Sequence, residues 1–272
     1  MIFARDKSQM CNNLLQFAHV YAWAREHNRS VMSMRFSYKY RFFKISHSKY
    51  ASFPLYLFAK YMAALKLLPT ASFKRITCDA PALEKMMLCH KHIVVSGWFV
   101  RFYDLFEKYK DEIRDLFTIL PEYTEPVRER MKESKDTLRL GVHIRRGDYA
   151  YWANGRFLYD DEVYKDHIAK FASFFPDKEI HIYLSTNDPE VSPANFNVQN
   201  VHVHQMKENN AVQDLFMLSE CDYIIGPPST FSLVASMYRD IPFYRMDTKD
   251  VENFSLDAFN TFNYWFRRIN EL

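Results

Sequence analysis

Apolar and polar positions are arranged differently in the two halves of this chain. In the second half, short apolar runs alternate with stretches whose apolar residues recur at helical spacing. The strands expected there cover 138–144, 179–184, 201–204, 223–226 and 242–245, and the helices cover 160–175, 213–220 and 229–238. Strands that alternate with helices predict an α/β fold, in which a parallel sheet is covered by helices.

The first half has a less regular pattern. Strands are expected at 2–4, 31–35 and 92–96, and helices at 10–26, 50–68 and 104–117. The segment 121–136 is charged and contains Pro126, so we interpret it as a helical connector near a domain boundary. We therefore expect two domains, 1–136 and 137–272, with the last helix a candidate to pack back on the first of them.

Residues 50–68 form the most apolar window of the chain. Pro54, Lys60 and Lys66 interrupt it, so it falls short of the roughly 20 apolar residues that span a membrane. We expect a core helix here, and a helix lying on a membrane surface is the alternative. The N-terminus lacks the apolar core of a signal peptide. The expected location is cytoplasmic, without a transmembrane segment, and the inner membrane face is the alternative.

Composition narrows the candidate functions. The chain has 36 Lys and Arg against 33 Asp and Glu, a net charge of +3, and its basic residues look scattered, so no nucleic-acid partner is expected. Its four cysteines show no CxxC spacing and are expected to be reduced thiols. With 5 glycines, the chain contains neither GxGxxG nor GxxxxGK[ST]. Any phosphate must then be held by side chains and helix N-termini.

The charged residues best suited to bind a ligand follow the apolar run 138–142. Arg145 and Arg146 are adjacent there, with Asp148 close behind them. Two neighbouring guanidinium groups are costly to bury without an anion, and a phosphate suits their forked donors. The alternative is a pair of ordinary surface salt bridges. Ligands of open α/β sheets bind at the carboxyl ends of the strands, which is where these arginines are expected.

Two other polar clusters follow predicted strands, at 185–188 and 227–232. In a parallel sheet, all three clusters lie along one edge. Ser229 or Thr230 can cap the helix that follows, and the free N–H groups at such a helix start attract an anion. If this helix start faces Arg145 and Arg146, the two sides form a clamp for a diphosphate.

Three further positions have an ordinary structural explanation. Asp214 stands at a helix start, where the helix dipole favours a carboxylate, although a carboxylate can also accept two N–H bonds from guanine. Asn12 is explained by helix capping. His202 and His204 have strand spacing, but no third ligand or carboxylate partner is visible, so no metal site is expected.

Taken together, these residues resemble the α-1,2-fucosyltransferase family, whose members use GDP-fucose. Residues 143–149 match the family hallmark H-x-R-R-G-D-Y in full. Residues 214–225 look like its D-L-x-L-M-S-x-C-x-x-x-I-I stretch, and 229–232 are similar to the start of S-T-F-S-W-W. Residues 10–18 look like the end of G-L-G-N-Q-M-F-Q-Y-A. The matches occur in family order.

The chain also departs from the family pattern. Ser8, Gln9 and Cys11 stand where the family has glycines, which let the backbone approach the sugar nucleotide closely. Asn13 replaces a glutamine, and residues 233–234 replace two tryptophans. The donor half therefore matches better than the acceptor half, and altered acceptor choice or reduced activity are alternatives.

The resemblance implies a GT-B-like fold: two Rossmann-like halves with parallel sheets face a cleft, and the donor site is on the C-terminal half. It also implies an inverting transfer of L-fucose from GDP-β-L-fucose to a hydroxyl of a glycan acceptor, in α-1,2 linkage and without a metal. The sequence has no DxD triplet, so arginines must supply the positive charge for the departing diphosphate.

Each site residue has an expected role. We assign Arg145 to the β-phosphate, with Arg146 adding charge or holding the geometry of the site. The resemblance places His143 and Asp214 at the guanine. The diphosphate is expected at the helix start, on Ser229, Thr230 and Phe231.

The acceptor side is less determined. The resemblance places Asn12 near the fucose or the acceptor. Asp148 could orient the arginines and is the first candidate for the general base, before Asp6 and Glu26. The acceptor is an oligosaccharide or polysaccharide, free or lipid-linked. A transferase of another linkage or another GDP-sugar, and a sugar-nucleotide-binding protein that lost catalysis, are the alternative functions.

Overall fold

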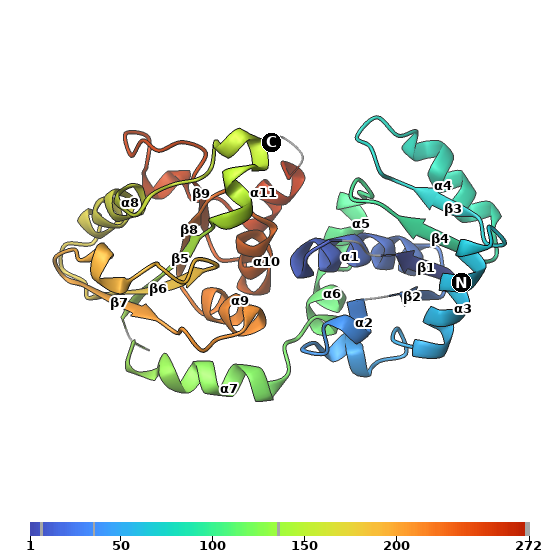
Figure 1. Ribbon diagram of the computed structural model, residues 1–272, viewed down its shortest axis with the longest axis horizontal. Helices are drawn as coiled ribbons and strands as arrows, with labels where there is room; N and C mark the ends of the chain where they lie inside the picture. Colours follow the sequence, from blue (N-terminus) through green and yellow to red (C-terminus); the bar gives the residue numbers. More distant parts are fainter. Residues whose placement is uncertain (6–7, 35, 135–136, 270–272) are drawn as a thin grey trace. The chain divides into compact units, whose positions relative to one another are not determined.

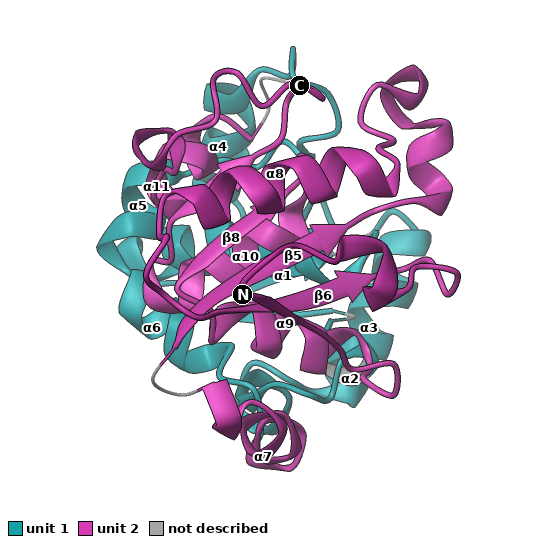
Figure 2. Ribbon diagram, turned by 90° about the vertical axis from the view of Figure 1, so that its left-hand side faces the viewer, with its two compact units in different colours: residues 1–120 teal, residues 121–272 magenta. Residues whose placement is uncertain are grey.

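The chain folds into two compact units, Met1–Leu120 and Pro121–Leu272 (Figures 1 and 2). The computed structural model describes residues 1–5, 8–34, 36–134 and 137–269. We expected the division after residue 136, which lies outside the described residues. The compact units instead separate before helix α7 (Pro121–Arg130), because α7 packs on helix α9 (Ala211–Ser219) of the second unit. The guanidinium of Arg128 lies 4.9 Å from the centroid of the Phe216 ring.

The first unit is built on a four-stranded parallel sheet. Its strands are β1 (Ile2–Arg5), β2 (Val31–Ser33), β3 (Thr70–Ser72) and β4 (Ile93–Ser96), in the order β2-β1-β4-β3. Its helices are α1 (Met10–Glu26), α2 (Phe36–Lys39), α3 (Phe53–Ala64), α4 (Ala80–Cys89), α5 (Tyr103–Lys108) and α6 (Lys110–Leu116). Strand β3 and helix α4 were not expected, and the single helix expected at 104–117 is interrupted at Tyr109.

Helix α3 corrects one expectation from the sequence. Of its residues only Ala59 is buried, whereas the side chains of Phe58 and Tyr61 are 49% and 60% exposed. The expectation that residues 50–68 form a core helix is therefore wrong. The reason is that α3 has apolar residues on more than one side, but the sheet covers only the side that carries Ala59. Within the described residues, no helix is long and apolar enough to cross a membrane.

The second unit is built on a five-stranded parallel sheet. Its strands are β5 (Leu138–Ile144), β6 (Ile180–Thr186), β7 (Val201–Gln205), β8 (Tyr223–Gly226) and β9 (Phe243–Arg245), in the order β7-β6-β5-β8-β9. Helices α8 (Asp161–Ser173) and α9 lie on opposite sides of this sheet (Figure 2). Helix α10 (Thr230–Arg239) packs beside α9, and α11 (Phe262–Arg267) packs on α10.

The alternation of strands and helices predicted for this half is confirmed, with ends shifted by a residue or two. The core explains why the pattern is so regular. Leu140, Val142 and Ile182 of the strands are fully buried and share one cluster with Tyr164 and Ile168 of α8. Because helices cover both faces of the sheet, its strands appear in the sequence as nearly continuous apolar runs.

Candidate functional site

Three polar clusters meet at the carboxyl edge of the second sheet. Arg145 follows β5, Asn187 follows β6 and Pro227 follows β8. The parallel registers of β5 with β6 and with β8 place these strand ends side by side. The expectation that the clusters share one edge is therefore confirmed, and this is the edge at which open α/β sheets bind their ligands.

The turn after β5 is fixed by an amide side chain from the next strand. The backbone N–H of Arg146 donates to Asn187 Oδ1 at 2.8 Å, and Asn187 Nδ2 donates to the Arg146 carbonyl at 3.0 Å. Gly147 follows with a φ of +67°, which side chains disfavour, and a Cβ there would lie 3.2 Å from Asn187 Nδ2. The chain therefore leaves β5 in one defined direction.

Arg146 is held by two carboxylates. Its guanidinium donates to Asp161, to Asp188 Oδ2 at 3.1 Å and to the carbonyl of Tyr159 at 3.3 Å. Burial acts to lower the pKa of Arg146, but the hydrogen bonds to Asp161 and Asp188 outweigh it and raise that pKa. Because two negative charges already neutralise Arg146, the geometry favours a role in shaping the site over a role in binding an anion.

Arg145 has a different environment. Its Nη2 lies 2.8 Å from Asp148 Oδ1, and the Asp148 side chain is 59% exposed. The guanidinium carbon of Arg145 lies 5.8 Å from the centroid of the Tyr149 ring. An exposed carboxylate remains solvated and is easily exchanged for another anion. Arg145 is therefore placed to bind a ligand phosphate.

Tyr149 joins the segment after β5 to the loop before α10. The Tyr149 ring is buried, and its hydroxyl donates a hydrogen bond to the carbonyl of Pro228. Burial raises the pKa of Tyr149 to about 12, so the hydroxyl keeps its proton at neutral pH and remains a donor. Through this contact, the turn that carries Arg145 and the start of α10 form one corner of the second unit.

The start of α10 completes that corner. Ser229 is the N-cap, and its Oγ accepts a hydrogen bond from the Phe231 N–H at 3.2 Å. Thr230 is the first residue of the helix. The partial positive charge of a helix N-terminus therefore lies on the same corner as the Arg145 turn.

His143 is fixed beneath this helix start. Its Nδ1 lies 2.7 Å from Ser232 Oγ, and its ring centroid is 5.1 Å from that of Phe231. Burial, with a smaller contribution from Arg145, lowers the pKa of His143 to about 3, so the imidazole is neutral at physiological pH. A Cβ on Gly226 would lie 2.9 Å from the His143 carbonyl oxygen, so this close packing requires a glycine.

Asp214 comes to the same edge from α9. Its Oδ2 accepts from Ser185 Oγ at 3.1 Å and its Oδ1 from Asn209 Nδ2 at 3.0 Å. Ser185 is the register partner of His143 between β6 and β5. Burial raises the pKa of Asp214 to about 6, so its protonation changes near neutral pH. His143 and Asp214, separate in the sequence, are thus linked through Ser185.

Some residues of this corner gave no signal in the sequence. Asp161 and Asn209 each flank a helix start, where an acidic or amide residue has an ordinary structural explanation. Asp188 belongs to one of the expected clusters, but nothing in the sequence pairs it with Arg146. These contacts depend on the order of the strands, which only the folded structure shows.

Asn12 belongs to the first unit. Its Nδ2 donates to Ser8 Oγ at 2.9 Å, and Nδ2 of the neighbouring Asn13 donates to the Ser8 carbonyl at 3.1 Å. Ser8 has a φ of +124°, a conformation typical of glycine. A serine therefore adopts a glycine-like conformation two residues before the start of α1. The expected place of Asn12 beside the fucose or acceptor stays a prediction.

The structure does not support the weaker candidates for the general base, Asp6 and Glu26. Asp6 lies outside the described residues. Glu26 accepts from Lys108 Nζ at 2.6 Å and from the Tyr109 hydroxyl at 2.9 Å, and these hydrogen bonds, that of Lys108 first, lower its pKa. Glu26 also ends α1, about 20 Å along the helix axis from Asn12 near its start. Such a carboxylate is a poor proton acceptor, and the two residues cannot serve one reacting centre.

The histidine pair of β7 has a carboxylate neighbour, contrary to expectation. Glu179 Oε1 lies 3.0 Å from His202 Nε2 and 3.3 Å from His181 Nε2, and potential ligand atoms of these three residues lie within 4.8 Å of one another. His181 Nδ1 also lies 2.9 Å from His204 Nε2. The cluster is at the amino ends of β6 and β7, opposite the edge that carries Arg145.

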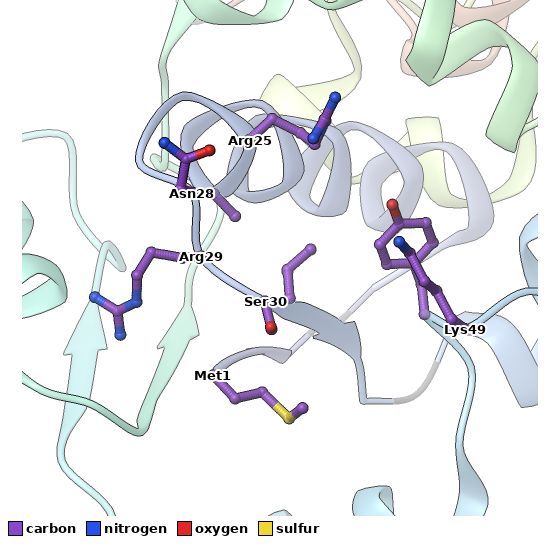
Figure 3. A pocket seen from close by; sticks show the side chains of 9 residues that line it. Met1, Arg25, Asn28, Arg29, Ser30 and Lys49 are labelled. Carbon is purple, nitrogen blue, oxygen red and sulfur yellow. The ribbon is translucent and has the colours of Figure 1, made fainter.

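A pocket lies at the amino ends of β1 and β2 (Figure 3). Its lining is Met1, Ala24, Arg25, Asn28, Arg29, Ser30, Val31, Lys49 and Tyr50. Arg29 extends away from Lys49 and donates to the carbonyls of Met87, His90 and Lys91. Arg25 pairs with Glu112 at 2.8 Å. Both guanidinium groups are thus engaged, and the pocket is at the edge opposite to the one where such sheets bind ligands.

No protein-family model matches the sequence, and no curated protein matches it. Solved structures do match. FUT1 of Arabidopsis thaliana, a point mutant in complex with GDP, has a TM-score of 0.64 at 11% identity, and the match covers 96% of this chain and 73% of that one.

Two further structures give the same result. POFUT1 in complex with GDP-fucose has a TM-score of 0.59 at 10% identity, with 88% of this chain and 94% of that one covered. The α-1,6-fucosyltransferase NodZ, soaked with GDP-fucose, has a TM-score of 0.58 at 14% identity, with 95% and 96% covered. The expected fold class is confirmed: the chain has the α/β fold with two parallel sheets, of the GT-B type, that these fucosyltransferases have.

Proposed function

We propose that this chain is a glycosyltransferase that moves L-fucose from GDP-β-L-fucose to a hydroxyl of a glycan acceptor. The observation that carries the proposal is the corner joined by Tyr149 and Pro228, where Arg145 and the start of α10 lie together. A guanidinium and a helix N-terminus are complementary to a diphosphate. Proteins of the same fold were solved with GDP or GDP-fucose, which supports this choice of donor.

In the proposed complex, Arg145 binds the β-phosphate, and Ser229, Thr230 and Phe231 bind the diphosphate at the start of α10. Arg146 holds the turn, as its two carboxylate partners indicate. Of the two roles expected for Arg146, adding charge or holding the geometry of the site, we therefore propose the second.

The guanine is proposed to bind at Asp214 and His143. An ionised carboxylate has about four lone-pair positions, and Ser185 and Asn209 use two of those of Asp214. The remaining positions can accept the N1–H and the amino group of guanine. His143 is neutral, so it adds a polar ring without adding charge.

The reaction needs charge stabilisation more than strong acid–base chemistry. The acceptor oxygen bonds to C1 of fucose from the face opposite the phosphate, and the C1–O bond to the β-phosphate breaks with its electron pair leaving on GDP. The acceptor proton passes to a base on the face opposite the phosphate. Asp148 is our candidate, and its exposed carboxylate must exchange Arg145 for the acceptor hydroxyl to act there. Arg145 stabilises the negative charge that develops on the leaving diphosphate, without a metal ion.

The acceptor and the linkage follow from the resemblance alone. We propose an α-1,2 linkage to an oligosaccharide or polysaccharide, free or lipid-linked, in cell-surface polysaccharide biosynthesis at the cytoplasmic side of the membrane. NodZ is described as an α-1,6 enzyme, so linkage varies among proteins of this fold. A transferase of another linkage or another GDP-sugar therefore remains the second candidate.

A binding protein that lost catalysis is the third candidate. The missing glycines near Asn12 favour it, but the glycine-like φ of Ser8 favours an active enzyme. Strain at one residue persists only where the surrounding structure enforces it, which is common at functional sites. Ser8 thus has an unusual conformation although it is not a glycine.

The decisive experiment supplies purified protein with GDP-fucose, GDP-mannose or UDP-galactose and a panel of glycan acceptors. Release of GDP from GDP-fucose, together with a fucosylated product whose linkage is read by NMR, is the expected result. Binding of GDP-fucose without turnover across the panel would support the degenerate binder. Turnover of a UDP-sugar in place of GDP-fucose would contradict the proposed donor.

A further inference from the structure

Helix α3 and the residues after it expose several large apolar side chains, which we treat as one surface. We call it the α3 apolar surface. It consists of Phe53, Leu55, Phe58, Tyr61, Leu65 and Leu67. Leu55, Phe58, Tyr61 and Leu65 follow one another at spacings of three, three and four residues, which places them on one side of a helix and its last turn.

The protein covers only the other side of α3. Ala59 is buried in a cluster with Phe3, Met32 and Val94 of the sheet, and Tyr56, Met62 and Ala63 pack against that cluster. Figure 1 shows α3 at the periphery of the first unit. A contiguous apolar patch on a folded protein marks a surface that contacts another molecule or a membrane. The outer side of α3 therefore needs an apolar partner.

All charged side chains of the sequence segment that carries this surface are basic. Residues 27–78 contain ten lysines and arginines and no aspartate or glutamate, although the whole chain has 36 basic and 33 acidic residues. This segment is therefore positively charged because it lacks acidic residues, although most of the basic residues lie elsewhere in the chain. Lys60 of α3 and Lys66, just after it, are exposed, as are Lys49 and Lys74 earlier and later in the segment. A partner with a negatively charged surface and an apolar interior matches both properties.

We infer that the α3 apolar surface docks onto a bilayer that contains acidic lipids. The large apolar side chains enter the boundary between headgroups and acyl chains, while Lys60 and Lys66 remain at the phosphates. Each basic residue near an acidic leaflet adds to binding, so several of them make a reversible attachment substantial. A second copy of the chain fits less well, because its equally basic surface would be repelled.

The length of α3 determines its orientation relative to the bilayer. Its twelve residues extend about 18 Å, which is too short to cross a hydrocarbon core of about 30 Å. One side of α3 is also held on the sheet by Ala59. The helix therefore lies in the plane of the interface and brings the first unit to the membrane surface. This attachment does not depend on the proposed transfer reaction, because its residues belong to no part of the candidate site.

The test is flotation of the full chain with vesicles of phosphatidylcholine alone, or of phosphatidylcholine mixed with phosphatidylglycerol. The wild-type chain is expected to float with the acidic vesicles only, and high salt should weaken that binding. The pair Phe58→Gln and Leu65→Gln removes apolar contacts, and the pair Lys60→Glu and Lys66→Glu reverses the charge. Each pair should lower the partition onto acidic vesicles about tenfold or more.

Matched controls lie on the second unit. Leu256→Gln changes an exposed leucine, and the pair Lys170→Glu and Lys178→Glu reverses two exposed lysines there, so both should leave flotation unchanged. The inference is overturned if the wild-type chain floats with neither vesicle, or if the α3 variants float as well as the wild type. It is also overturned if the wild-type chain binds no vesicles and sedimentation shows that it is a dimer. In that case the pair Phe58→Gln and Leu65→Gln would dissociate the dimer. GDP release from GDP-fucose, measured without vesicles, reports separately on the proposed function.

Discussion

The hydroxyl of Tyr149 donates a hydrogen bond to the carbonyl of Pro228, and this contact joins two segments 79 residues apart in the sequence. One segment carries Arg145 after β5, and the other leads to Ser229 at the start of α10. The guanidinium and the helix N-terminus are thereby presented at one corner of the second sheet.

Arg145→Ala should lower the rate of fucose transfer by about 100- to 1,000-fold, because one donor that stabilises charge in the transition state is lost. GDP-fucose hydrolysis should fall in parallel. The measurement is GDP release under saturating donor. Arg156→Ala, which changes an exposed arginine in the same segment, is the matched control. Turnover within a few-fold of wild type in Arg145→Ala would remove Arg145 from the mechanism.

Arg146→Ala should act mainly on stability. Without the guanidinium, Asp161 and Asp188 lose their shared partner at a site where both carboxylates are about 21% exposed. We expect the free energy of unfolding to fall by about 2–4 kcal/mol in denaturant titrations. Arg145→Ala should cost less than about 1 kcal/mol, because the Asp148 side chain is largely exposed. Equal losses in the two variants would contradict the separate roles.

Asp214 should make GDP binding depend on pH. Its pKa is raised to about 6, and the ionised carboxylate is the form that accepts the guanine N–H groups. GDP affinity should therefore rise between pH 5 and pH 7, by roughly tenfold for the one proton involved. Calorimetry across this range should show the rise in the wild type and none in Asp214→Asn. A rise of the same size in Asp214→Asn would refute the guanine role.

The raised pKa of Asp214 also makes the free energy of unfolding depend on pH. Between about pH 4 and pH 6 the folded chain keeps the Asp214 proton while the unfolded chain has released it, so unfolding becomes easier as the pH rises. The stability lost over this window is on the order of 3 kcal/mol, since each pKa unit corresponds to about 1.4 kcal/mol. Asp214→Asn should lack this loss, which is read by subtracting the unfolding free energies of the two proteins at each pH.

Turnover should not need a metal ion. Treatment with a chelator is expected to leave fucose transfer unchanged, because Arg145 and the helix start supply the positive charge. His181→Ala removes one of the three grouped side chains at the opposite edge and should also leave transfer intact. Strict dependence of transfer on added manganese or magnesium would contradict the charge assignment.

Ser8→Gly should stabilise the first unit. Serine pays a steric cost at a φ of +124°, and glycine adopts this conformation freely, although it also gains entropy in the unfolded chain. The net gain is expected to be about 0.5–1 kcal/mol. Thermal unfolding measures it, and Ser48→Gly, at a φ of −107°, is the control that should not stabilise. A destabilised Ser8→Gly would mean that the serine side chain matters more than the backbone.

The sequence predicted the second sheet well because its strands are buried on both faces. Continuous apolar runs such as 138–144, each followed by polar residues, then determine both the strand and the edge where the polar residues gather. The same pattern located Arg145, Asp188 and Ser229 at one edge, whereas Asp214 was placed beside them by the family resemblance alone. The hallmark motif identified residues 143–149 as candidates, and the expected parallel sheet predicted that they lie close to the other strand-end clusters.

Other features depend on contacts that the sequence pattern does not encode. Arg145 and Arg146 are neighbours, and only the positions of Asp161 and Asp188 show which of them is already neutralised. The apolar run of α3 predicted burial, but composition cannot show that the sheet covers one side of the helix only. Likewise, Glu179 approaches His202 because β6 pairs with β7, a neighbour relation set by topology.

The central claim is that the corner of Arg145 and the α10 start binds a guanosine diphosphate. The most direct measurement is the thermal unfolding of the wild type and Arg145→Ala with GDP and with UDP. A ligand at 100 times its dissociation constant stabilises a folded protein by about 2.7 kcal/mol, which gives a clear rise in melting temperature. We predict this rise for GDP with the wild type, a much smaller one with Arg145→Ala, and none with UDP. Equal shifts with GDP and UDP, or no loss of the GDP shift in Arg145→Ala, would contradict the claim.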